Sequence, residues 1–272
     1  DRITALNDVP REPLVPRRLG KNMCVPFGKI LRGKVVPNTV TKTLHTDKVY
    51  EPDLNSFTIE PFPYYSPLKS QIETIKSFDR PVILVDDLVH TANRLQVLVP
   101  QLREDGIPIK KVVVGVLSGY GRDLMQCLKV PVESIYSMPN LRQWFVESTL
   151  YPFIGGDTVR REEMKVAGLQ PSINMILPYA TPRLSGCSRE ALVEFSACCI
   201  ENSRDLFQVL EAEYRKMYAK NLTLSRLSEA VILPLCPDKG SCMEYDENLA
   251  ASVYLENDLE TLWRMKEFLI KG

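Results

Sequence analysis

The sequence has little of what a metal centre or a membrane protein needs. Its 272 residues include two histidines, His45 and His90, and seven cysteines without the paired spacing of a zinc site. Lysine and arginine together number 34, and so do aspartate and glutamate, so no net charge attracts nucleic acids or an anionic membrane. No apolar run approaches the ~20 residues of a membrane-spanning helix. We therefore expect no zinc, no nucleic-acid partner and no membrane partner.

The cysteines and the start of the chain bear on its location. The seven cysteines are scattered and odd in number, and the first residues lack a signal-peptide pattern. Free thiols of this kind are typical of a reducing compartment, which favours a cytoplasmic location. A Cys–His nucleophile stays open as an alternative use of one thiol. The chain starts at Asp1 rather than Met, which favours a piece of a longer protein; an upstream domain and a homodimer both stay open.

The most informative stretch of the chain is a short apolar run that ends in two acids. Val82–Val85 suits a strand buried on both faces, and Asp86 and Asp87 follow it. After a loop at 88–93, an apolar pattern of helical spacing is formed by Leu95, Leu98, Val99 and Leu102. Ligands of parallel sheets collect at the carboxyl ends of strands, and helix N-termini bind anions. The carboxylates can accept hydrogen bonds from sugar hydroxyls while the loop amides and the Thr91 hydroxyl hold a phosphate.

Val82–Arg94 resembles the loop that binds phosphoribosyl pyrophosphate (PRPP) in type I phosphoribosyltransferases. That loop has hydrophobic residues, two acids, two hydrophobic residues, a variable residue and Thr-Gly-type residues before a helix. Two positions depart from the pattern, because His90 replaces a small or acidic residue and Ala92 stands where Gly is commoner. The resemblance implies that Asp86 and Asp87 hold the ribose 2′- and 3′-hydroxyls. It also implies that the 5′-phosphate lies against Val89, His90, Thr91, Ala92, Asn93 and Arg94.

Two other kinds of protein have a strand that ends in acids. One has an ordinary Rossmann-like strand with a solvated acidic end, and this alternative stays open. The other is a receiver domain, in which the acidic strand lies near the start of the chain and an acceptor aspartate ends a later strand. The later strand here, around Ser134–Pro139, has no aspartate. A receiver domain is therefore not expected.

Basic residues near the N-terminus occupy the position at which the resembled family binds pyrophosphate. A short strand is expected at 12–16, and the loop after it carries Arg17, Arg18 and Lys21. Positive charge in a tight turn suits pyrophosphate, and the Gly-Gly pair usual in the family is missing. We predict a pyrophosphate contact by these three residues. A frayed N-terminal arm is the alternative.

The region after this loop corresponds to the small hood of the resembled family. Alternating residues predict a strand at 37–44, and Lys42 and Lys48 are the candidates for a further pyrophosphate contact. Solvated lysines are the alternative. The polar residues 51–66 resemble the mobile loop that closes over the substrate in this family, and such closure excludes water from a reactive sugar centre.

Helices and strands alternate along residues 1–165, which predicts an α/β domain with a mostly parallel sheet flanked by helices. The resemblance implies that this sheet is of phosphoribosyltransferase type. Further strands are expected at 111–117 and 132–136, and the spacing between 82–85 and 111–117 suits a right-handed βαβ crossover. Helices are expected at 25–34, at 67–78 after an N-cap at Ser66, at 93–104, and from Arg122 onward. Pro100 should kink or shorten the helix at 93–104.

An aromatic segment follows the last of these strands. Tyr151, Phe153 and Asp157 are similar to the aromatic and aspartate elements that contact the base in purine-type phosphoribosyltransferases. An aromatic ring can stack on several bases because stacking needs only a π face. The resemblance therefore implies that these three residues contact a base or another acceptor. The alternative is that the aromatics pack against the C-terminal part of the chain.

Residues 166–272 are predicted to form a separate helical C-terminal domain. Ser188 suits the N-cap of a helix, a second helix follows it, a short helix is expected at 225–231, and a last helix starts at a capping pair, Asn257 and Glu260. The apolar stripes of these helices are expected to form the core: Leu192, Phe195, Cys199, Leu206, Val209, Leu210, Tyr214, Met217, Leu259, Leu262, Met265 and Leu269. Dimerisation or docking to another domain is the alternative role of the stripes.

The resemblance implies an enzyme that acts at ribose C1′ of PRPP or a nucleotide, with a nitrogenous base or a related acceptor. It also implies that Mg²⁺ takes part and is held mainly by oxygens of the substrate, since Mg²⁺ keeps several waters and needs few protein ligands. Catalysis would come from positioning and from stabilising the charge of the leaving group. The alternative is a domain that binds PRPP or a nucleotide without turnover, as a regulatory signal or within a larger assembly.

Overall fold

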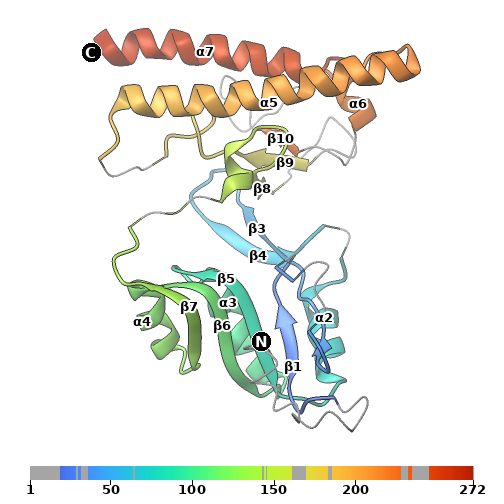
Figure 1. The fold of residues 1–272 in the computed structure, drawn as a ribbon, viewed down its shortest axis with the longest axis vertical. Coiled ribbons are helices and arrows are strands. Elements are labelled where there is room, and N and C mark those ends of the chain that lie inside the picture. The colour runs from blue at the N-terminus through green and yellow to red at the C-terminus, as the bar shows by residue number, and fades with distance from the viewer. Residues whose placement is uncertain are drawn as a thin grey trace. The chain divides into compact units, whose positions relative to one another are not determined.

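The fold is seen in a computed structural model that describes residues 19–28, 30–31, 36–63, 65–142, 144, 146–160, 170–182, 186–227, 232–234 and 245–271 (Figure 1). The chain forms two compact units. The first consists of Asp1–Asp47 and Ile59–Arg142, and the second of Lys48–Thr58 and Gln143–Gly272. The boundary predicted between residues 165 and 166 lies in 161–169, outside the described residues.

The first unit contains a five-stranded parallel sheet, as the alternation of strands and helices predicts. Its strands are β1 (Met23–Pro26), β2 (Val40–Thr41), β5 (Val82–Val89), β6 (Ile109–Ser118) and β7 (Val132–Met138). They lie in the order β2-β1-β5-β6-β7, and every neighbouring pair is parallel. The expectation of an α/β fold with a mostly parallel sheet is therefore confirmed.

Three helices accompany this sheet: α2 (Leu68–Lys76), α3 (Asn93–Glu104) and α4 (Gly119–Cys127). Alternate residues of a strand point to opposite faces of a sheet. Val82 and Leu84 accordingly join the main core with residues of all three helices, whereas Ile83 and Val85 belong to a smaller cluster. The buried stripe predicted for α3 is present, and the helix continues past Pro100, which is exposed. Packing of the stripe therefore outweighs the hydrogen bond that the proline removes.

Several predicted elements of the first unit differ from the structure. The helix expected at 25–34 is wrong at its start, because residues 23–26 form the fully buried strand β1 between β2 and β5. The strand expected at 37–44 is reduced to the two residues of β2. Helix α2 has Pro67, not Ser66, as its N-cap residue. Strand β5 continues through Asp86 and Asp87 to Val89, since it pairs with β6 along this length.

A second sheet, which the sequence did not predict, contains β10 (Ile232–Pro234), β9 (Gln170–Ile173), β8 (Asp157–Val159), β3 (Thr46–Tyr50) and β4 (Phe57–Pro61) in that order. Strand β3 pairs with β8 in parallel, and β8 pairs with β9 antiparallel. Strand β4 falls within the segment predicted as a mobile flap. Residues 57–61 of that segment thus form a strand rather than a loop.

The C-terminal helices are α5 (Arg189–Tyr218), α6 (Leu224–Leu227) and α7 (Ala251–Lys271). The N-cap at Ser188 is confirmed, because its side chain accepts a hydrogen bond from the Ala191 N–H at 3.1 Å. One continuous helix, α5, replaces the two that were predicted. The start predicted at Asn257 is wrong, because α7 is already helical from Ala251. Helices α5 and α7 lie side by side in Figure 1 and share a core with β8 and β9.

Only part of the apolar stripe predicted for α5 is buried. Of its residues in the first half of the helix, Cys199 is 4% exposed, and Leu192 and Phe195 are half-buried against the same core. The core also takes four residues outside the predicted stripe, each at most 3% exposed: Val193, Ala197, Ile200 and Phe207. Four predicted residues of the second half are exposed by 44–65%: Leu206, Val209, Leu210 and Met217. The prediction that these four belong to the core is therefore wrong. Helical spacing indicates a shared face of a helix but does not show what covers it.

Candidate functional site

The strand order of the first sheet reverses between β1 and β5. When the five strands of this sheet are numbered by their order along the chain, their order across the sheet is 2-1-3-4-5, and β5 is number 3. In open α/β sheets, ligands bind at such a reversal, beyond the carboxyl ends of the two strands. Pro26 pairs with Val85 at these ends, so Phe27 and Asp86 follow the last paired positions directly. The sheet topology thus singles out the edge that carries Asp86.

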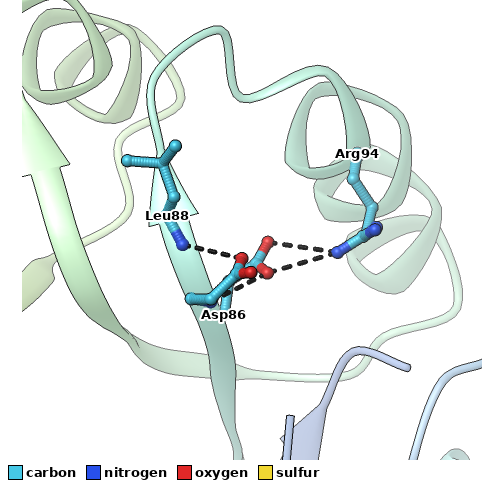
Figure 2. Close-up of polar contacts among 4 residues, drawn as sticks. Asp86, Leu88 and Arg94 are labelled. Atoms are coloured by element: carbon cyan, nitrogen blue, oxygen red, sulfur yellow. Dashed lines mark hydrogen bonds and ion pairs between the residues drawn. The ribbon is translucent and has the colours of Figure 1, made fainter. Parts of the chain in front are cut away.

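Asp86 forms an ion pair with Arg94 of α3 at this edge. Nη1 of Arg94 lies 3.2 Å from Oδ1 and 3.4 Å from Oδ2 of Asp86, and Figure 2 shows Arg94 pointing from α3 toward Asp86 on β5. The guanidinium also stands over the ring of Phe27, 5.2 Å from its centroid. Burial raises the pKa of Asp86 to about 7, and the charge of Arg94 opposes this rise. The carboxyl group of Asp86 therefore changes charge near neutral pH.

The two acids have different surroundings. Asp86 is 7% exposed, whereas Asp87 is exposed. The backbone N–H of Asp87 donates to Oδ1 of Asp86 at 3.0 Å, and the N–H of Leu88 donates to Oδ1 of Asp87 at 2.8 Å (Figure 2). Backbone donors thus position both carboxylates on β5 directly after the part of the strand that pairs with β1. The resemblance implies the same role, contact with the sugar, for both acids. In the structure, however, Asp87 is open to solvent and Asp86 faces Arg94.

The turn from β5 into α3 leaves the start of the helix without a side-chain cap. Ala92 is the N-cap residue, with left-handed backbone angles (φ 51°, ψ 23°), and no side-chain hydrogen bond caps α3. The first amide groups of a helix lack intrahelical partners and carry partial positive charge. Thr91 is exposed beside them, and its carbonyl accepts a hydrogen bond from Nε2 of Gln96 at 2.7 Å. This arrangement, in which Asn93 is the first helical residue, suits an anion.

Val89 and His90 connect the turn to the next strand and helix. Nδ1 of His90 lies 2.8 Å from Oγ of Ser118, which caps α4 by accepting a hydrogen bond from the Gly121 N–H. A Cβ on Gly121 would lie 2.2 Å from the carbonyl oxygen of Val89. Glycine is therefore required there for the close approach of α4 to the end of β5. Sequence reasoning missed Ser118 and Gly121 as supports of the site; small residues directly after β6 are the signal that could have indicated them.

The basic residues predicted to contact pyrophosphate lie in different places. Lys21 is exposed and precedes β1, so it lies at the opposite end of the sheet from Asp86. Lys42 is exposed, and its backbone N–H donates to the carbonyl of Cys24 in β1 at 3.1 Å. Arg17 and Arg18 lie outside the described residues. The strand expected at 12–16 lies outside the described residues too; β1 is the first described strand, and the loop after it starts at Phe27.

Tyr151 and Phe153 belong to the second unit. Phe153 is completely buried, and Tyr151 packs against the same core. Three aromatic rings surround Phe153 at centroid distances of 5.8–6.2 Å, those of Phe207, Tyr245 and Tyr254. The faces of its ring are therefore occupied by side chains of the protein itself. Phe153 therefore packs with the C-terminal part of the chain, which is the alternative to a contact with a base.

Asp157 forms an ion pair with Lys48, the second lysine considered for pyrophosphate. Nζ of Lys48 lies 3.4 Å from Oδ2 of Asp157 and 2.5 Å from the Tyr50 hydroxyl. It also stands over the rings of Tyr50 and Phe57, 4.2 and 4.6 Å from their centroids. Burial raises the pKa of Asp157, and the charge of Lys48 opposes that rise. Both charges are thus engaged within the second sheet, where they connect β3 to β8.

Metal ligands are sparse among the described residues, where no group of three or more His, Cys, Asp or Glu side chains could hold a metal ion. A Mg²⁺ ion held mainly by substrate oxygens needs only one or two protein carboxylates, and the exposed Asp87 fits this requirement. None of the helices formed by the described residues has the length and apolar character to cross a bilayer.

Comparison of the chain with protein-family models and with curated proteins finds no match. The resemblance to phosphoribosyltransferases therefore rests on Val82–Arg94 and on where this segment lies in the sheet. A functional assignment has to be argued from that geometry.

Proposed function

We propose that the first unit binds PRPP and that the protein is a phosphoribosyltransferase-like enzyme, which acts at ribose C1′ of PRPP or a nucleotide with a base or related acceptor. One observation carries the proposal. The segment with the PRPP-loop pattern, Val82–Arg94, ends its strand at the reversal point of a parallel sheet and enters a helix that no side chain caps. An acid open to solvent, Asp87, lies at the same strand end.

Each part of the segment has a role in this proposal. The amides of the turn and the Thr91 hydroxyl bind the 5′-phosphate, which is the anion suited to the start of α3. Asp87 accepts hydrogen bonds from the ribose hydroxyls. Asp86 and Arg94 orient each other, and Arg94 adds positive charge next to the phosphate. His90, hydrogen-bonded to Ser118, holds the turn against α4.

The chemistry in this proposal is displacement at a sugar carbon. The bond from C1′ to the pyrophosphate oxygen breaks with its electron pair, and a nitrogen of the acceptor forms the new bond to C1′. Mg²⁺ supplies positive charge to the leaving pyrophosphate and is held mainly by substrate oxygens. The protein's own contribution is to position the ribose and to stabilise charge on the leaving group.

The pyrophosphate contact belongs, in this proposal, to the loop that follows β1. That loop starts next to Asp86 in the sheet, because Pro26 and Val85 are paired. Its sequence contains three basic residues, Lys29, Arg32 and Lys34, within 27–34. Like Arg17 and Arg18, these three lie outside the described residues, and they join the predicted candidates because the resembled family binds pyrophosphate in the loop after a strand at the start of its sheet.

Calorimetric titration with PRPP and Mg²⁺ tests the proposal. We expect Asp86→Asn combined with Asp87→Asn to weaken PRPP binding by at least about 100-fold, equivalent to about 3 kcal/mol, while circular dichroism shows an intact fold. Asp157→Asn is the matched control, because it removes a partly buried, ion-paired aspartate from the second unit and should leave the affinity unchanged. Parental affinity in the double variant would show that the sugar contacts lie elsewhere.

A second function is favoured by one observation, the ion pair between Asp86 and Arg94. An acid that is already paired and buried has limited capacity to accept a sugar hydroxyl, which suits a domain that binds PRPP or a nucleotide without turning it over. Assay of pyrophosphate release from PRPP across a panel of bases separates the two functions. Release with any base supports the enzyme, and binding without release under every acceptor supports the non-catalytic domain.

A further inference from the structure

A basic hollow lies at the C-terminal end of α5, in the second unit. Its volume is about 460 Å³, a size typical of small-molecule sites. Three cationic side chains line it, those of Arg215, Lys220 and Arg226, together with the amides of Asn221 and Asn248. None of its lining residues is acidic. The hollow therefore concentrates positive charge and hydrogen-bond donors in one place.

Backbone hydrogen bonds fix the walls of the hollow. Helix α5 ends at Tyr218, and its C-cap residue Ala219 has a left-handed backbone (φ 54°) and donates its N–H to the carbonyl of Arg215 at 2.8 Å. The chain then turns into α6, which lies beside this end of α5 in Figure 1. The N–H groups of Leu224 and Ser225 donate to the carbonyls of Leu249 and Glu247, each at 2.9 Å. The surrounding frame is thus held independently of any ligand.

The cations of the hollow have neutral partners. Nη2 of Arg215 donates to Oδ1 of Asn221 at 2.9 Å, and Nη1 of Arg226 donates to the Tyr214 hydroxyl at 3.2 Å. None of the ion pairs between described residues includes Arg215, Lys220 or Arg226. Lys216 next to them is paired with Glu213 at 3.7 Å. The positive charge of the hollow is therefore left uncompensated by the described side chains.

We propose that this hollow binds a small molecule with two or more linked phosphate groups. Three positive charges match the charge of such a chain, and guanidinium and amide N–H groups donate to several phosphate oxygens at once. The shared chemistry has two sources, an inorganic polyphosphate and the phosphate chain of a nucleotide. The site lies in the second unit, so it is separate from the segment Val82–Arg94 and does not depend on the function proposed for that segment.

Calorimetry with inorganic tripolyphosphate and the full chain tests the site. We expect Arg215→Gln, Lys220→Gln and Arg226→Gln together to weaken binding by about tenfold or more, and added salt to weaken binding to the parent protein. Lys216→Gln is the matched control, because this exposed lysine lies on the same helix and outside the hollow; its effect should stay within about twofold. Equal affinity of the parent and the triple variant, no binding by the parent, or an equal loss in the control overturns the proposal.

Titrations with other ligands distinguish the source of the phosphate groups, and single variants replace the triple variant if it does not fold. Tighter binding of adenosine triphosphate than of tripolyphosphate assigns the site to a nucleotide, and equal binding assigns it to an inorganic chain; both support phosphate recognition. Single-stranded RNA that binds more tightly than either, with the same dependence on the three cations, overturns the small-molecule proposal. If circular dichroism shows that the triple variant is unfolded, the single variants Lys220→Gln and Arg226→Gln test the proposal instead. Each should weaken tripolyphosphate binding by about two- to threefold.

Discussion

The end of β5 and the segment at 151–157 offer the same kinds of side chain in different surroundings. Each contains an aspartate whose pKa is raised by burial, and in each the charge of one nearby cation opposes that rise. The pairs are Asp86 with Arg94 and Asp157 with Lys48. The end of β5 adjoins an exposed acid and an uncapped helix start. Around Asp157, by contrast, the cation is already covered by two aromatic rings and a hydroxyl.

This difference separates the proposed ligand site from an ion pair that is satisfied within the protein. A raised pKa and an ion pair occur in both places, so neither feature alone marks a functional site. The end of β5 has donors and an acceptor that the protein leaves open, whereas Lys48 and Asp157 satisfy each other across β3 and β8. Four predictions, taken from the largest expected effect to the smallest, can break or sharpen this contrast.

The largest expected effect is that of Phe153→Ala. This completely buried ring contacts three other aromatic rings, so its loss should lower the free energy of unfolding by about 3–5 kcal/mol. Urea unfolding measures the change, and PRPP affinity below the unfolding range should stay parental. Trp144→Ala is the control, because Trp144 is 45% exposed and should change stability by less than about 0.5 kcal/mol. Weaker PRPP binding in folded Phe153→Ala would return this ring to the site.

Removal of each cation should have similar effects on stability and different effects on titration. Arg94→Met leaves Asp86 buried without its partner, which should cost about 1–3 kcal/mol and raise the pKa of Asp86 beyond about 7. Lys48→Met should cost a similar amount at Asp157 and leave Asp86 unchanged. Carboxyl NMR titration of both variants measures the pKa of Asp86. A pKa of Asp86 that stays the same in Arg94→Met contradicts the role of this ion pair.

The raised pKa of Asp86 predicts a dependence of stability on pH. Because the pKa lies at about 7 in the folded protein and near 3.8 without burial, the folded state binds more protons between these values. The contribution of Asp86 to the stability of the folded protein is therefore fully present below pH 3.8 and is lost as the pH rises through about 7. We expect the parent protein, compared with Asp86→Asn, to lose on the order of a few kcal/mol across this window in urea unfolding.

The comparison with Asp86→Asn isolates this one group, because Asp157 also has a raised pKa and titrates in both proteins. Parallel stability profiles of the parent and the variant across the window would contradict the buried, titrating Asp86.

The smallest expected effects are those of two exposed lysines. Lys42→Gln and Lys21→Gln should each change the free energy of unfolding by less than about 0.5 kcal/mol. Lys42 lies beside β1, so its loss should weaken PRPP binding by about two- to threefold, whereas Lys21 lies at the far end of the sheet and its loss should not. Calorimetric titration distinguishes them. An equal loss in both variants would point to a general effect of charge rather than to a contact.

The sequence predicted those parts of the fold whose signals are local. The runs that became β5 and β6 are apolar over several residues, and α3 has a full stripe of helical spacing, so each could be recognised alone. β1 was missed because its four residues continue into further apolar residues at helical spacing. The second sheet was missed because its strands have only three to five residues each and come from distant segments. Val49 and Thr158, for example, are paired across more than a hundred residues.

The candidate site could be predicted in its position but not in its internal contacts. Asp86, Asp87 and the turn into α3 follow from the order of residues along the chain. The ion pair with Arg94 and the burial of Asp86 depend on how α3 packs against β5, which a pattern of residue types does not contain. Phe153 shows the converse error, since an aromatic ring suited to a base is equally suited to a core.

The path of the chain has a practical consequence for anyone who divides this protein. Lys48–Thr58 joins the second unit, while the residues on both sides of it join the first. A fragment that stops at Arg142 would carry β3 without its neighbour β8 and so present a bare strand edge, a known cause of aggregation. Separate expression of the units therefore requires that Lys48–Thr58 be attached to the C-terminal residues of the second unit. In the first unit, Asp47 must then be linked to Ile59.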